Sequence, residues 1–185
     1  MRRGYTVEEY LEWVHRIREI VPNASISTDL IVGFCGESEA QFANSLKILE
    51  DLRFDKVHVA AYSPRPGTIA WRHMEDTVPQ AEKMRRLHAV EALQERIATE
   101  LNAAFLDTTQ EVLVEGWKEA DDGATVFTGR NRMNKLVHFR LAEDVGALLR
   151  TATAPAIGDL APVHISKTTP WSLQGEMAGA AVAAR

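Results

Sequence analysis

The hydrophobic pattern of the sequence changes once, near residue 109, and this change limits the possible folds more than any other feature. Before it, two short apolar runs, at 25–33 and 56–62, alternate with segments in which apolar residues recur at helical spacing. After it come five short runs rich in β-branched residues, separated by glycines. The pattern predicts an α/β unit over 1–108, a small all-β barrel of the OB type over 109–178, and a disordered tail over 179–185.

The first unit should contain a strand, a helix and a second strand that runs parallel to the first. Capping boxes begin two helices, at Thr6 with Glu9 and at Ser38 with Gln41. The apolar run of each strand is too short for a helix, and we expect it to be buried on both faces of a parallel sheet. Short connections between such elements give right-handed βαβ units.

A long loop and a long helix should follow the second strand. Pro64, Pro66 and Gly67 predict that residues 62–78 leave the sheet and cross the surface as a loop. Pro79 suits the first turn of a helix that ends near residue 107 and links the two units. The expected apolar face of this helix contains Met84, Leu87, Val90, Leu93, Ile97, Leu101 and Phe105.

Composition excludes several classes of protein. The 185 residues include 21 basic and 26 acidic side chains, and a net charge of -5 argues against binding of nucleic acid by the whole chain. A single cysteine, Cys35, and six histidines without paired ligand spacing exclude a disulfide framework, a zinc ribbon and a self-contained iron–sulfur site. No apolar run is long enough to span a membrane, so we expect a cytoplasmic protein without a membrane partner.

The carboxyl ends of the two expected strands offer the first candidate site, because ligands of parallel α/β folds bind there. Gly33 and Gly36 lie in the turn after the first strand, and the segment YSPRPGT (62–68) follows the second. Asp29 lies within an apolar run, where a carboxylate is costly unless it is paired or faces a pocket, and we favour the pocket. The alternative is that the glycines only shape a tight turn and the prolines only stiffen an exit loop.

The segment GRNRMNK in the expected barrel offers the second candidate site. Arg130, Arg132 and Lys135 cluster there with Asn131 and Asn134. Such side chains pair with phosphates and base edges in OB-type RNA-binding proteins. A solvated hairpin is the alternative, and the residues alone do not choose between the two.

Six segments across almost the whole chain resemble the C-terminal part of radical-SAM methylthiotransferases. They are MRRGYT, STDLIVGFCGE, YSPRPGT, VLVEG, GRNRMNK and WSLQGE. The resemblance is closest to the members that methylthiolate isopentenylated adenosine next to the anticodon of tRNA. It implies the C-terminal half of a radical-SAM (β/α) partial barrel, followed by a TRAM domain, which is a small OB-like RNA-binding barrel.

The resemblance also implies cofactors, a partner and site residues. The family uses S-adenosyl-L-methionine (SAM) and two [4Fe–4S] clusters, and its partner here would be a tRNA anticodon stem-loop, with a monomeric full-length enzyme. The residues that would flank SAM are Arg3, Asp29, Ile31, Gly33, Ala61 and Tyr62. Those that would face tRNA are Arg130, Arg132, Asn134 and Lys135.

The chain also departs from the family pattern. The family places a C-x-x-x-C-x-x-C loop upstream of the segment MRRGYT, and this chain has no such cysteines, so Met1 resembles an internal residue and the chain an inactive fragment. Cys35 stands where the family usually has proline. Two alternatives remain: a non-catalytic RNA-binding remnant, and the sister enzyme that methylthiolates an aspartate of a ribosomal protein.

Overall fold

The computed structural model describes residues 4–141 and 154–183. The chain divides into two compact units, Met1–Ile97 and Ala98–Arg185, and the division falls within one long helix. None of the helices in the described ranges is both long and apolar enough to span a bilayer.

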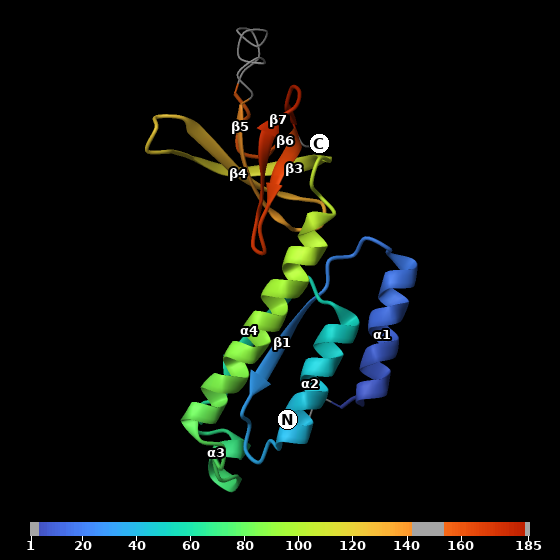
Figure 1. Ribbon diagram of the computed structural model, residues 1–185, viewed down its shortest axis with the longest axis vertical. Coiled ribbons are helices and arrows are strands. Elements are labelled where there is room, and N and C mark those ends of the chain that lie inside the picture. The colour runs from blue at the N-terminus through green and yellow to red at the C-terminus, as the bar shows by residue number, and fades with distance from the viewer. Residues whose placement is uncertain (1–3, 142–153, 184–185) are drawn as a thin grey trace. The chain divides into compact units, whose positions relative to one another are not determined.

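The first unit contains the predicted strand–helix–strand arrangement. Strands β1 and β2 pair in parallel, from Ser27 opposite Lys56 to Val32 opposite Ala61, and α2 and α4 lie beside β1 (Figure 1). The elements of this unit are α1 (Val7–Ile20), β1 (Ser27–Val32), α2 (Glu39–Leu52), β2 (Lys56–Ala61), α3 (Ile69–His73) and the greater part of α4 (Gln80–Ala103).

Both predicted capping boxes are present. The Thr6 hydroxyl accepts a hydrogen bond from the amide of Glu9 at 3.3 Å, and the Glu9 carboxylate accepts one from the amide of Thr6 at 2.7 Å. Ser38 and Gln41 repeat this exchange at 3.2 and 2.9 Å. Each box satisfies two amides that a helix start otherwise leaves without partners.

The prediction that both strands are buried on both faces was wrong. One face packs against the helices, where Val32, Phe42, Leu52 and Phe54 are among the buried residues. The other face exposes Asp29 of β1 and Lys56, His58 and Ala60 of β2, while Ile31 near the end of β1 is half-buried.

The segment 62–78 also differs from the prediction, because it contains the short helix α3. The Thr68 hydroxyl caps this helix by accepting from the amide of Trp71 at 3.2 Å. Five residues are too few for a hydrophobic period to show in the sequence. Helix α4 begins just after Pro79, as predicted, and ends at Ala103 rather than near residue 107.

The second unit is the predicted small barrel. Strands follow one another in the order β3-β4-β5-β7-β6, and β6 pairs back with β3, which closes five strands into a barrel. Every pairing is antiparallel except that of β5 with β7. The bounds are β3 (Thr109–Glu119), β4 (Thr125–Asn131), β5 (Leu136–Leu141), β6 (Asp159–Thr168), β7 (Leu173–Met177) and β8 (Val182–Ala183).

The barrel has a filled interior and a short sixth strand. Its interior is closely filled, with Phe127 and Phe139 stacked at a centroid distance of 5.4 Å among buried aliphatic side chains. Two residues of the expected disordered tail, Val182 and Ala183, form β8 and pair with Leu160 and Asp159 of β6.

Candidate functional site

A cavity of about 780 Å³ lies at the carboxyl ends of β1 and β2, where the sequence predicted a ligand site. It is mostly apolar, and its cationic side chain is that of Arg65. The lining consists of Ile31, Phe34, Ala60, Ala61, Tyr62, Ser63, Arg65, Thr68, Ile69, Ala70 and Met74. The cavity thus joins the ends of both strands to the segment that contains α3.

Tyr62 is the lining residue with the most unusual surroundings. Its ring packs edge-on against Phe34 at a centroid distance of 4.9 Å. The pKa of the Tyr62 phenol is raised above its usual value, chiefly by its interaction with the Cys35 side chain and then by burial. Apart from this weak sulfur contact, the buried hydroxyl finds no hydrogen-bond partner among the described residues.

Lys83 of α4 binds the backbone just after the end of β2. Its side chain is only 3% exposed, and its Nζ donates to the Tyr62 carbonyl at 3.3 Å and to both carboxylate oxygens of Asp76 at 2.6 and 2.7 Å. The aliphatic part of Lys83 lies against Gly33. One buried lysine therefore contacts the turn after β1 and the residue after β2.

Arg86, one turn further along α4, holds the turn after β1. Its Nη1 donates to the Glu37 carboxylate at 2.7 Å and to the Glu37 carbonyl at 3.0 Å. The same carboxylate accepts from the Gly33 amide at 2.6 Å. Arg85 and Arg86 both bind Glu82 and lower its pKa to about 2. A continuous set of charged hydrogen bonds thus fixes the turn on α4.

Replacing Gly33 with alanine should loosen this turn. Gly33 has a φ of +70°, and a Cβ added there would collide with the aliphatic chain of Lys83. We expect a loss of about 1–3 kcal/mol in unfolding free energy, measured by chemical denaturation. Gly36→Ala is the matched control, because Gly36 has a similar φ of +77° but open space around the added Cβ. Equal losses in both variants would contradict packing of Lys83 against the turn.

The structure brings together three of the residues that the sequence assigned to this site. Ile31, Ala61 and Tyr62 all line the cavity. Gly33 lies in the adjoining turn, with its amide already bound to Glu37. Asp29 lies two residues before Ile31 and does not line this cavity, and Arg3 lies outside the described residues.

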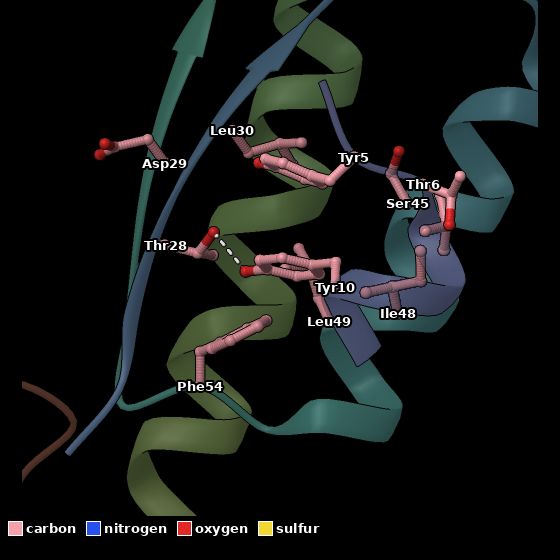
Figure 2. Close-up of a pocket in the computed structure, with 11 residues that line it drawn as sticks. Tyr5, Thr6, Tyr10, Thr28, Asp29, Leu30, Ser45, Ile48, Leu49 and Phe54 are labelled. Atoms are coloured by element: carbon pink, nitrogen blue, oxygen red, sulfur yellow. Dashed lines mark hydrogen bonds between the residues drawn. The ribbon is translucent and has the colours of Figure 1, made fainter. Parts of the chain in front are cut away.

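A smaller recess of about 240 Å³ lies between α1, β1 and α2 (Figure 2). The Tyr10 hydroxyl and the Thr28 hydroxyl are paired within it at 3.0 Å, and Tyr5 stacks on Tyr10 at 5.9 Å. Figure 2 shows the carboxylate of Asp29 on the opposite side of β1 from Tyr10. Asp29 is among the residues that line the recess, but its carboxylate points away from Tyr10, and the hydroxyls of Tyr10 and Thr28 already bind each other, which makes the recess a weaker candidate than the cavity.

The GRNRMNK segment contains the last three residues of β4 and the turn that leads to β5. Buried Asn131 shapes it, since its Oδ1 accepts from the amides of Met133 at 3.1 Å and Lys135 at 2.9 Å. Asn134 takes a left-handed backbone conformation with a φ of 56°. Lys135 is buried, with 9% of its surface exposed.

The two arginines of this segment point outward and are ion-paired. Arg132 is 81% exposed and lies 2.6 Å from the Glu111 carboxylate. Arg130 lies 3.5 Å from Glu115 and also donates to the Asn134 carbonyl at 3.0 Å. The predicted RNA-facing set thus contains two exposed, already paired cations, one residue at a turn and one buried lysine.

Sequence reasoning missed Lys83 and Arg86. They lie three residues apart on α4 and are not among the residues of its expected apolar face. Only their helical spacing to Val90 could have indicated that they are buried. No group of three or more histidine, cysteine or acidic side chains in the described ranges is arranged to hold a metal, and Cys35 is half-buried beside Tyr62. The described residues therefore offer no ligand set for an iron–sulfur cluster.

Comparison with known proteins identifies relatives across nearly the whole chain. No family model matches it. A tRNA-2-methylthio-N(6)-dimethylallyladenosine synthase of Dehalococcoides mccartyi (strain CBDB1) is 46% identical over 177 residues, which cover 96% of this chain and 38% of that protein. Synthases of the same name from Thermosipho africanus (strain TCF52B) and Herpetosiphon aurantiacus (strain ATCC 23779) are each 44% identical, over 96% and 99% of this chain.

These matches confirm the resemblance to tRNA methylthiotransferases. The chain spans about two fifths of the length of these relatives, at 38% and 39% of each. Because the match covers 96% or more of the chain, it includes both the strand ends that line the cavity and the five-stranded barrel. Over nearly its whole length, the chain is therefore similar to a stretch of about two fifths of tRNA-2-methylthio-N(6)-dimethylallyladenosine synthases.

Proposed function

We propose that this chain is the part of a radical-SAM tRNA methylthiotransferase that borders SAM and binds the tRNA substrate. The observation that carries the proposal is a match to such synthases over 96% of the chain, which includes both units. In this proposal, 1–108 is the C-terminal half of a (β/α) partial barrel with its linker helix, and 109–178 is a TRAM domain. The reaction adds a methylthio group to isopentenylated adenosine beside the anticodon.

The lining of the large cavity fits the adenosine part of SAM. Ile31, Ala61 and the ring of Tyr62 supply apolar surface, and the Tyr62 hydroxyl is buried with no described partner except the Cys35 thiol. Arg65 would face the SAM carboxylate from the segment after β2. When bound, SAM supplies the methyl group and the precursor of the reactive radical.

The remaining predicted residues would act at the border of this site. Gly33 would let the ligand approach the backbone of the turn, and Asp29 would lie on the exposed face of the strand pair, as would Ile31. Arg3 remains a proposed contact for the carboxylate. Both [4Fe–4S] clusters would depend on cysteines supplied by the rest of a full-length enzyme, since this chain has one cysteine.

The barrel would hold the anticodon stem-loop of tRNA. Because its substrate would be tRNA, we place the enzyme in the cytoplasm. The full-length protein would work as a monomer. The names of the relatives specify an adenosine in tRNA, which favours tRNA over a ribosomal protein as the substrate.

A chimeric enzyme tests this proposal. The matching stretch of the Dehalococcoides mccartyi synthase is replaced by this chain, and the chimera is expressed in a strain that lacks its own synthase. We expect methylthiolated isopentenyladenosine to reappear in tRNA, measured by mass spectrometry of digested nucleosides. The control is the same synthase with the stretch deleted, which should leave isopentenyladenosine unmodified.

Two outcomes would contradict the proposal. The first is a chimera that is soluble and contains its clusters but leaves the tRNA unmodified. The second is a new methylthio group on a ribosomal protein rather than on tRNA, which would make the sister enzyme the correct assignment.

A further inference from the structure

The outer face of the barrel presents a row of polar side chains that no sequence motif indicated. The pairing register sets His138 opposite both Thr128 and Gln174, and Gln174 opposite Lys167. Residues that are directly opposite in a sheet point to the same face, so these four side chains cross β4, β5, β7 and β6 in one line. Two residues further along β5 and β7, Arg140 is opposite Glu176.

Three residues of this row, His138, Gln174 and Lys167, line a groove of about 460 Å³, and Thr128 at the end of the row does not. One wall is the far end of the β3–β4 hairpin, which contributes Lys118, Ala120 and Val126. The tip of that hairpin is fastened to β5, because Arg140 donates to the Asp122 carboxylate at 2.8 Å. Residues of β3, β4, β5, β6 and β7 therefore line the groove.

The groove is predominantly cationic. Lys118, Arg140 and Lys167 line it, with Glu176 as the carboxylate among the lining residues. Among the described residues, no ion pair joins Lys118 or Lys167 to a carboxylate. The pKa of His138 is lowered, first by burial of the imidazole and then by the positive charge of Lys118. Two lysines that line one groove without a carboxylate partner attract an anionic ligand.

The GRNRMNK turn offers a poorer phosphate site. Arg130 and Arg132 already pair with Glu115 and Glu111, and Lys135 is buried. A phosphate would have to displace a carboxylate from each arginine. In the groove, Lys118 and Lys167 need no such exchange.

We propose that the groove between the β3–β4 hairpin and the β5–β7 pair, and not the GRNRMNK turn, holds the sugar–phosphate backbone of the tRNA stem-loop. This inference rests on the proposed function. Lys118 and Lys167 contact phosphates, while Gln174 forms hydrogen bonds with ribose hydroxyls and Arg140 stays paired with Asp122 of the hairpin. Such contacts position RNA by its shape and 2′-hydroxyls.

Binding of a synthetic tRNA anticodon stem-loop to the 185-residue chain tests the inference. The dissociation constant is measured by fluorescence anisotropy over a salt series, for the unchanged chain, Lys118→Gln, Lys167→Gln and the double variant. Each lysine variant should bind several-fold more weakly and lower the slope of log K against log salt by about one unit. Both lysines are exposed, so their replacement should leave the thermal unfolding curve unchanged.

Two matched variants remove a positive charge elsewhere. Arg132→Gln tests the GRNRMNK turn, and Lys47→Gln removes an exposed lysine from α2 in the other unit. Neither should change the affinity or the salt slope. A DNA hairpin of the same sequence should bind more weakly than RNA, because it lacks the 2′-hydroxyls.

The outcomes separate the two proposals. If the unchanged chain fails to bind the stem-loop, the barrel is not the tRNA-binding part, and the proposed function fails together with the groove. If the unchanged chain binds and Arg132→Gln weakens binding while the lysine variants do not, the groove is overturned and the tRNA-binding role stands. Losses confined to the lysine variants support the groove.

Discussion

Replacing Gly175 with alanine is expected to open the five-stranded barrel. Gly175 of β7 is opposite Ile165 of β6, and a Cβ at position 175 would collide with the carbonyl group of His164 and approach the Ile165 backbone. Neither backbone can move without breaking the β6–β7 ladder. We expect a loss of about 3 kcal/mol in unfolding free energy, at the upper end of the range for overpacking.

Hydrogen exchange followed by mass spectrometry would measure this loss in β6 and β7 separately from the other unit. Gly116→Ala is the matched control, because Gly116 also lies in a barrel strand but has open space around the added Cβ. Gly129→Ala should resemble Gly175→Ala, since its Cβ would meet the backbone of Leu113. Unchanged exchange in Gly175→Ala would mean that β6 and β7 approach less closely than the collision with the His164 carbonyl requires.

The elements that the sequence predicted correctly are those determined by neighbouring residues. The capping boxes at Thr6 and Ser38 depend on contacts three residues apart. The barrel strands follow from runs of β-branched residues between turns, which need no knowledge of their partners. Local chemistry was therefore sufficient for most element starts and for the change from α/β to all-β structure.

The buried face of α4 could not be predicted because distant groups determine it. Of the residues expected on its apolar face, Val90 and Ile97 are fully buried. The other most buried positions include four polar side chains whose donors bind backbone carbonyls: Lys83, Arg86, Gln94 and Asn102. Those carbonyls lie in turns and strand ends far away in the sequence, and hydrophobic periodicity contains no information about them.

The cationic groove escaped sequence reasoning for a related reason. Its lysines come from β3 and β6 and are brought to one groove by strand register. The GRNRMNK segment was conspicuous because its cations are close together in sequence. In the structure, Asn131 and the left-handed Asn134 give that segment a second role, which is to form the turn between β4 and β5.

Replacing Arg86 with methionine should destabilise the first unit and loosen the border of the cavity. The Arg86 side chain is 5% exposed and is the partner of Glu37, whose side chain is 13% exposed and holds the Gly33 amide. Methionine keeps much of the aliphatic volume but leaves the Glu37 carboxylate buried without its cation. We expect a loss of about 3 kcal/mol in unfolding free energy, because removing one partner of a buried ion pair leaves an uncompensated charge.

Arg85→Met is the matched control for this effect. Arg85 binds the carboxylates of Glu39 and Glu82, as Arg86 also does. Its side chain is 52% exposed, however, and it does not contact Glu37. Its loss should leave the unfolding midpoint nearly unchanged, because exposed ion pairs contribute little. Hydrogen exchange at the Gly33 amide should accelerate in Arg86→Met alone. Equal effects of the two substitutions would mean that α4 stabilises the unit through its overall charge, and that the bond from Glu37 to Gly33 does not depend on Arg86.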